Sequence, residues 1–382
     1  MVMNGEDLPD RAVLDAYTVK GSDLQDYLTK PARHELKCFV TVLSDPRGLE
    51  SPGNARMGLL PDTPEPVSRS QLLGDPLFHL RYQLFVIRQR IAMRLPDAWI
   101  PALHLDFGVL PVLEAFGCAL TEGGGSTWAK PVISSPEQGH DLQPDFSRPR
   151  CREILSAARV WLERTGGALP ISAGGVHGPL SCAAQILGVT EFLTAFYTHP
   201  SEVHHLLDTV TAAIIRWMEL LEQACGHRLR GAAQYHVPSR EGIFAGEDEL
   251  VLISAEHFRQ FGVPPLSELS RAFGGIFVHF CGGSTHNLEG IRRIPGIRGV
   301  DSQFTPDQFV AARRILGPDV LILTRVRNRP AGAGDLSLDY LQQYLALARR
   351  TRTLLWLFAD SPEQATQFCG MVLSERARGP AA

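Results

Sequence analysis

Two residues of metal-binding type, His279 and Cys281, lie two positions apart at the end of the apolar run Gly275–Phe280. In an extended strand, residues i and i+2 point to the same side, so both side chains are expected to face one space. An imidazole beside a thiolate is a common part of a zinc site. The glycines that follow let a ligand approach the backbone. A buried His/Cys pair with a purely structural role remains the alternative.

Further polar residues lie where other apolar runs end, and parallel strands bring such ends together in a barrel. His177 precedes a Gly-Pro turn and is expected to line the cleft or to make a structural hydrogen bond. Asp248 fits a general acid or base, or a helix cap. Tyr235 and His236 end another run and are expected to contact substrate. Arg325 fits a carboxylate or phosphate clamp, unless its loop is simply solvated.

Short apolar runs alternate with longer amphipathic ones from about residue 98 onward. The runs lack polar alternation, which is typical of parallel strands buried on both faces. Predicted strands are Ala98–Leu103, Ala168–Ala173, Gly231–Val237, Gly275–Phe280, Ile297–Val300, Val320–Thr324 and Thr353–Phe358, with a weaker candidate at Lys130–Ile133.

Helix-start signals separate these strands. Thr305-Pro306 and Ser361-Pro362 each begin a capping-box pattern with proline at the first helical position. The segment Ser201–Cys225 carries apolar residues at helical spacing. Repeated strand, loop and capped helix favour an α/β fold, a single (β/α)8 TIM-like barrel over residues 96–382. Residues 1–95 are expected to form an irregular and helical N-terminal extension.

The composition excludes several classes of protein. The chain has 382 residues and a net charge of −4, with 37 basic and 41 acidic residues, which argues against a nucleic-acid partner. No apolar run reaches membrane-spanning length, and the polar N-terminus is unlike a secretory signal. Seven widely spaced cysteines without a CxxC argue against a disulfide framework. We therefore expect a cytoplasmic protein that contacts no membrane.

Motifs across residues 98–370 resemble, in the right order, those of the uroporphyrinogen decarboxylase superfamily, nearest its corrinoid-dependent methyltransferase branch. The element HFCGG is similar to the superfamily's HxCG. The other similar motifs are the Phe116-Gly117 pair, the Gly178-Pro179 turn, the helix start at His199-Pro200, and the acidic turn Glu247-Asp248 followed by Ser254–Phe258.

The resemblance implies a methyltransferase that moves a methyl group between a corrinoid, supplied by a partner protein, and a thiol or other small acceptor. It also implies zinc held by His279, Cys281 and a later cysteine. That cysteine is missing from Leu355–Asp360, so Asp360 is expected to replace it. Two alternatives stay open. One is a decarboxylase acting on a tetrapyrrole or other polycarboxylate, although no RQAGRY motif is present. The other is a non-catalytic binding or accessory barrel.

Overall fold

The computed structural model describes residues 8–30, 35–42, 72, 74–105, 110–123, 126–231, 240–283, 285–326, 338–349, 351–359 and 361–378. The chain divides into two compact units. The first comprises Met1–Leu103, Glu163–Pro170 and Gly299–Ala382, and the second comprises His104–Leu162 and Ile171–Arg298.

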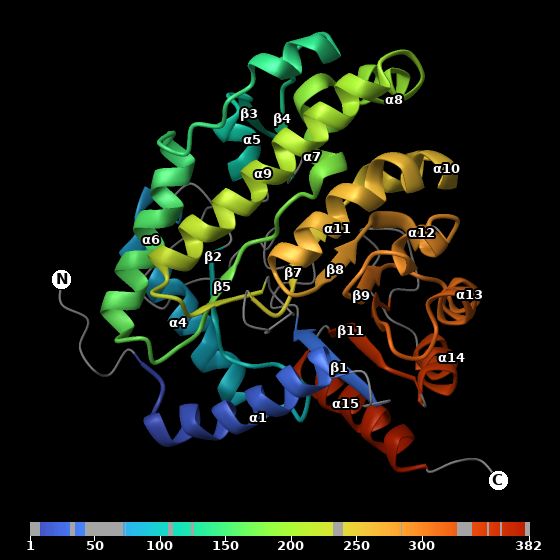
Figure 1. The fold of residues 1–382 in the computed structure, drawn as a ribbon. Coiled ribbons are helices and arrows are strands. Elements are labelled where there is room, and N and C mark those ends of the chain that lie inside the picture. Colours follow the sequence, from blue (N-terminus) through green and yellow to red (C-terminus); the bar gives the residue numbers. More distant parts are fainter. Residues whose placement is uncertain are drawn as a thin grey trace. The chain divides into compact units, whose positions relative to one another are not determined.

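The first unit contains a parallel sheet whose strands pair in the order β1–β11–β10–β9. Helix α15 packs along β1 and β11 (Figure 1). The strands are β1 (Leu36–Val42), β9 (Ile297–Ser302), β10 (Leu321–Arg325) and β11 (Thr353–Ala359). The helices are α1 (Arg11–Thr29), α4 (Pro76–Ala92), α13 (Pro306–Leu316), α14 (Leu338–Ala348) and α15 (Pro362–Ala377).

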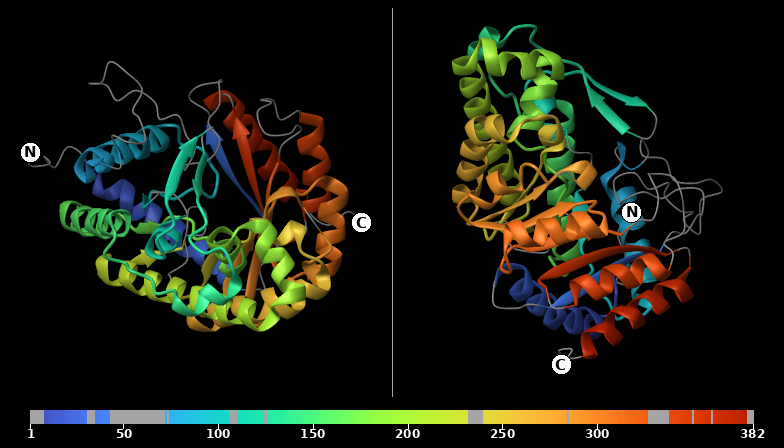
Figure 2. Two further views of the ribbon diagram at one scale, coloured as in Figure 1. Left: turned by 90° about the horizontal axis from the view of Figure 1, so that it is seen from above. Right: turned by 90° about the vertical axis from the view of Figure 1, so that its right-hand side faces the viewer.

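The second unit has shorter strands and more helix. Strand β7 pairs with β8 in parallel, and β5 pairs with β6 in parallel. Strands β3 and β4 form an antiparallel hairpin, drawn in teal in Figure 2. The strands are β2 (Leu103–Leu105), β3 (Leu120–Gly123), β4 (Ser126–Ala129), β5 (Ile171–Ala173), β6 (Leu229–Arg230), β7 (Ile243–Gly246) and β8 (Ile276–His279).

The helical segments of the second unit include three that follow one another directly. Helices α7, α8 and α9 pack on one another, with Phe192, Leu206 and Trp217 in their buried core. The helices are α5 (Pro111–Ala115), α6 (Pro149–Thr165), α7 (Pro179–Leu187), α8 (Val189–Thr198), α9 (Pro200–Ala224), α10 (Ala255–His257), α11 (Val263–Ala272) and α12 (Leu288–Arg292). Short turns of other helix types are η2 (Pro136–Asp141), η3 (Asp248–Leu252), η4 (Phe258–Gly262) and η5 (Cys281–Gly283).

Most predicted elements appear with shifted ends. The capping box at Thr305 is confirmed, and Ser361 caps α15 through its side chain. The predicted strand Ala98–Leu103 is wrong in most of its length, because Pro101 lacks the N–H that a ladder needs and β2 begins at Leu103. Lys130–Ile133 is not a strand, since the amides of Val132 and Ile133 donate to the carbonyl of Ile186 at the end of α7. Most of Gly231–Val237 lies outside the described residues.

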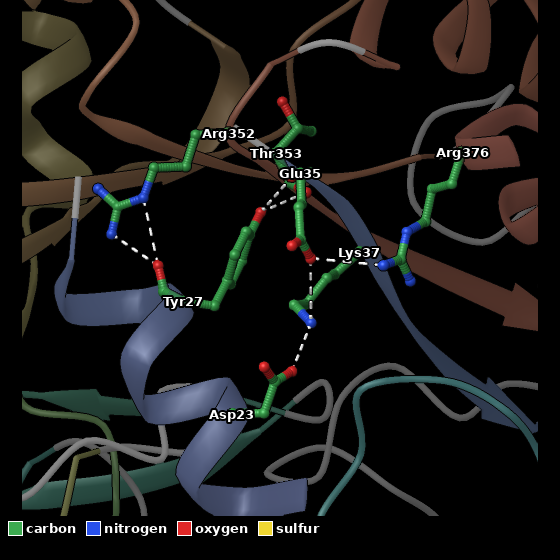
Figure 3. A network of polar contacts seen from close by, with 7 residues as sticks. All are labelled: Asp23, Tyr27, Glu35, Lys37, Arg352, Thr353 and Arg376. Carbon is green, nitrogen blue, oxygen red and sulfur yellow. Dashed lines mark hydrogen bonds and ion pairs between the residues drawn. The ribbon is translucent and has the colours of Figure 1, made fainter. Parts of the chain in front are cut away.

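Strand β1 was not predicted, because Lys37 interrupts its apolar pattern. The structure shows why a lysine is tolerated there: its Nζ lies 2.8 Å from Asp23 and 3.5 Å from Glu35 (Figure 3). Whether the chain divides near residue 95, as the sequence pattern indicates, stays a prediction. Among the described residues no single helix is long and apolar enough to cross a membrane, although α7 and α8, bent by 103°, reach that length and composition jointly.

A buried arginine fixes the end of α1 on the sheet of the first unit. Arg352, 2% exposed, donates to the carbonyl of Tyr27 at 2.8 Å (Figure 3). It also donates to the carbonyl of Leu28 at 2.7 Å and to that of Asp319. The last carbonyls of a helix have no partner within the helix and carry partial negative charge, so a guanidinium stabilises them. The Tyr27 hydroxyl in turn donates to the carbonyl of Thr353 at 2.7 Å.

Replacing this arginine tests how far the first unit depends on it. Arg352→Ala should lower the free energy of unfolding by about 3 kcal/mol or more, because a buried carbonyl without a donor costs about 1–3 kcal/mol. Arg376→Ala is the matched control, since its half-exposed pair with Glu35 at 3.4 Å should contribute less than about 1 kcal/mol. Urea denaturation measures both. If both variants lost the same free energy of unfolding, the proposed role of Arg352 in the stability of the first unit would be contradicted.

Candidate metal centre

Asp248, His279 and Cys281 lie together in the second unit. One ligand atom from each falls within 4.8 Å of the other two. His279 Nε2 is 3.6 Å from Cys281 Sγ and 3.6 Å from Asp248 Oδ1. The imidazole is buried, with its side chain 10% exposed, whereas Asp248 is 45% exposed and Cys281 is exposed. The three side chains therefore form a cluster that is anchored on one side and open to solvent on the other.

The parallel pair β7–β8 places these residues. Gly246 and His279 are partners in the strand register, so Asp248 and Cys281 each follow their strand by two residues. After Cys281 the chain turns at Gly282, whose φ of 83° is a left-handed conformation that glycine adopts without strain. The H-x-C spacing thus puts both donors on the same side, as the sequence pattern indicates.

Glu247 is a residue of this region to which sequence reasoning assigned no role. Its carboxylate is fully buried and accepts hydrogen bonds from the backbone N–H groups of Leu180 at 3.2 Å and Ser181 at 2.8 Å, in the first turn of α7. Its own N–H donates to the carbonyl of His279 at 2.7 Å. A Cβ at position 178 would lie 2.3 Å from Glu247 Oε1, so any residue other than glycine there would have to displace this carboxyl group.

The acidic run 247–249 could have indicated such a residue, but not which of the three is buried. Burial raises the pKa of Glu247 to about 8, against the lowering effect of the two backbone donors. Burial also raises the pKa of Glu249, whose carboxylate accepts a hydrogen bond from the Ser181 hydroxyl. The two glutamates flanking Asp248 thus connect η3 to the start of α7.

Asn287 holds the other end of η3. Its side chain is 1% exposed, and Nδ2 donates to the carbonyls of Leu250 and Ile253, each at 2.8 Å. Asp248 therefore sits on a turn that is fixed at its start by Glu247 and at its end by Asn287. Because the turn is already fixed, the carboxyl group of Asp248 stays beside His279, and little backbone freedom would be lost when a cation binds.

His177 lies next to the cluster. It forms an isolated parallel bridge with Gly246, and a Cβ added at Gly246 would lie 3.9 Å from His177 Cδ2 and 4.0 Å from His279 Cδ2. Gln185 Nε2 is 2.9 Å from His177 Nδ1. Because an amide nitrogen can only donate, the proton of the neutral ring resides on Nε2. Burial lowers the pKa of His177, and His279 adds to this effect while Asp248 opposes it.

The other predicted site residues are not among the three described residues that form this cluster. Arg325 belongs to the first unit, at the end of β10. Tyr235, His236 and Asp360 lie outside the described residues. Their predicted parts in substrate binding and metal binding stay predictions.

The donor set fits zinc. Zinc–nitrogen and zinc–oxygen bonds of about 2.0–2.1 Å and a zinc–sulfur bond of about 2.3 Å, at tetrahedral angles, separate neighbouring ligand atoms by about 3.3–3.6 Å. The two separations of 3.6 Å measured from His279 Nε2 lie at the upper edge of that range. Asp248 Oδ1 is buried and accepts no hydrogen bond within the described structure, as expected of an oxygen placed for a cation. Three protein ligands with one open position are usual for catalytic zinc.

Glu247→Gln tests the anchoring contact, because an amide offers one acceptor where two backbone donors need partners. The free energy of unfolding should fall by about 1–3 kcal/mol at pH 5. In the wild type, the folded-state pKa of about 8 lies above the ordinary value near 4.5, so the folded chain binds more protons between those values. The stability that this group contributes is therefore fully present below about pH 4.5 and is lost progressively as the pH rises toward 8.

The gap in stability between wild type and Glu247→Gln should accordingly narrow as the pH rises from 5 to 8. Urea denaturation at several pH values measures it, with the exposed Glu268→Gln on α11 as the matched control. A gap that widens with pH would mean that the buried carboxylate is stabilised as an anion.

Comparisons with known proteins identify the family and the fold of the chain. Residues 100–323 match the uroporphyrinogen decarboxylase (URO-D) family. A methylcobamide:CoM methyltransferase, MtaA, of Methanosarcina barkeri is 25% identical over 189 residues, which are 48% of this chain and 52% of that protein. The chain thus matches about half the length of this curated relative.

A solved structure shares the fold. A methyltransferase from Methanosarcina mazei superposes with a TM-score of 0.60 at 17% identity, covering 94% of this chain and 98% of that one. The match confirms the predicted α/β fold class, a (β/α) barrel. On the family match over more than half of its length, the chain belongs to the uroporphyrinogen decarboxylase family.

Proposed function

We propose that this chain is a methyltransferase that moves a methyl group between a corrinoid and a thiol, with Asp248, His279 and Cys281 as the ligands of a zinc ion. The observation that carries the proposal is the cluster of carboxylate, imidazole and thiol within 4.8 Å. The relative from M. barkeri, named for methyl transfer from a methylcobamide to CoM, supports the choice of reaction. We further propose that a partner protein presents the corrinoid.

The chemistry that zinc supplies when bound is the acidification of a substrate thiol, so that a thiolate nucleophile forms near neutral pH. The residues of the chain hold the metal ion and orient the substrate. Cys281 on the exposed side leaves room for a substrate sulfur, while the buried His279 fixes the cluster to β8. Asp248, expected from sequence as a general acid or base, is here assigned to the metal.

His177 is assigned a positioning role at the edge of the cluster. Because burial lowers its pKa, the ring is neutral at pH 7 and adds no positive charge beside the metal ligands. Its Nε2–H is available as a hydrogen-bond donor to a substrate heteroatom, with Gln185 holding the ring orientation. The alternative reaction is a decarboxylation, as the name of the family indicates, and no feature of the described residues favours it over methyl transfer.

The metal assignment predicts zinc content directly. The purified chain should hold about one zinc ion, and Cys281→Ala or Asp248→Ala should weaken zinc affinity more than roughly 100-fold, beyond the effect of losing an outer-shell partner. Affinity should also fall as the pH drops, since Cys281 and His279 must shed protons to bind. Elemental analysis and competition with a chromogenic chelator measure both.

Cys225→Ala is the matched control, because this buried cysteine ends α9 and should leave the zinc content unchanged. Activity is measured with methylcobalamin and a set of small thiols, following the absorbance of the cobalamin. A wild-type chain that binds no zinc after supplementation would contradict the metal assignment. A zinc-loaded chain that methylates no thiol would contradict the reaction.

A further inference from the structure

Arg325 in the first unit has an unusual set of partners. It is the last residue of β10, and its guanidinium carbon lies 4.6 Å from the ring centroid of Trp356, its register partner on β11. Its Nε is buried and has no hydrogen-bond partner in the part of the chain that the structure describes. Buried guanidinium nitrogens are normally bonded to an acceptor, so this N–H can donate to a bound ligand.

The Trp356 ring, which the guanidinium of Arg325 contacts, is held in place by its neighbours. Trp356 is 3% exposed, and its Nε1–H donates to the Thr41 hydroxyl on β1 at 2.8 Å. Phe358, two residues further along β11, stacks on Trp356 with centroids 5.3 Å apart and is half-buried. Stacking on an aromatic ring holds the guanidinium in one plane, so less freedom is lost when it binds a ligand.

These side chains lie where a ligand is expected to bind, near the carboxyl ends of parallel strands. Arg325, Trp356 and Thr41 come from the adjacent parallel strands β10, β11 and β1, toward their carboxyl ends. In parallel α/β folds, ligands bind at the carboxyl ends of the strands. The same face therefore offers one planar cation, one hydroxyl and one aromatic ring that is partly accessible.

We propose that Arg325 binds the carboxylate of a small organic acid whose planar, apolar body lies against Phe358. A planar guanidinium matches a planar carboxylate with two parallel hydrogen bonds. One guanidinium balances one negative charge, and Trp356 and the two side chains that contact it, Thr41 and Phe358, are uncharged, so this group of side chains suits a monoanionic carboxylate better than a phosphate. The site goes beyond the proposed methyl transfer and does not depend on the metal ligands.

Benzoate is the probe, titrated into the full-length chain by isothermal calorimetry or ligand-observed NMR. The wild type should bind benzoate more tightly than acetate or inorganic phosphate. Arg325→Lys keeps the charge but loses the planar fork, and should weaken benzoate binding at least tenfold. Phe358→Leu should reduce the preference for benzoate over acetate. Arg349→Lys, on an arginine already paired with Glu375, is the matched control and should bind as the wild type does.

Other outcomes overturn the proposal. They are no benzoate binding by the wild type, equal binding by Arg325→Lys with an intact fold by circular dichroism, and Arg325-dependent binding of phosphate in preference to benzoate. Cys281→Ala should retain benzoate binding. A failure of this site and a failure of the metal assignment are therefore distinguishable.

Discussion

The buried carboxylate of Glu247 is the contact on which the arrangement around Asp248 depends. It joins the start of α7 to the end of β7, while its own N–H joins the end of β7 to the end of β8. The two adjacent residues therefore have different contacts: Glu247 accepts hydrogen bonds from backbone N–H groups, and Asp248 lies beside His279. Burying a carboxyl group is costly, and two backbone hydrogen bonds at a helix N-terminus offset that cost.

The electrostatics of the second unit follow from that burial. Burial raises the pKa values of Glu247 and Glu249, which limits the negative charge that accumulates beside Asp248. The neutral His177 keeps positive charge away from the same place. A divalent cation would thus meet the carboxyl group of Asp248, the imidazole of His279 and the thiol of Cys281.

The sequence predicts the parts of the site that depend on local geometry. The two-residue spacing of His279 and Cys281 on an extended segment is enough to place both on one side. Asp248 was recognised from its position after an apolar run, but its proximity to His279 depends on the register of β7 against β8, which is a long-range pairing. The inward direction of Glu247 depends on the docking of α7 and has no local sequence signal.

The fold shows the same limits. Capping patterns located α13 and α15 within a residue or two, because caps are local. Strand β1 escaped prediction, since the lysine within it is neutralised by residues on α1 and beside the strand rather than within it. Pro101 shortened one predicted strand because it lacks an N–H, and the predicted strand Lys130–Ile133 was lost because its amides bond to the carbonyl of Ile186; apolar periodicity signals neither cause.

The central claim is that Asp248, His279 and Cys281 ligate one zinc ion. Zinc K-edge X-ray absorption on the full-length, zinc-loaded chain tests it most directly. The account predicts one sulfur at about 2.3 Å and nitrogen and oxygen ligands at about 2.0–2.2 Å, with the sulfur shell lost in Cys281→Ala. A spectrum with two sulfur ligands, or one unchanged by Cys281→Ala and Asp248→Ala, would contradict it.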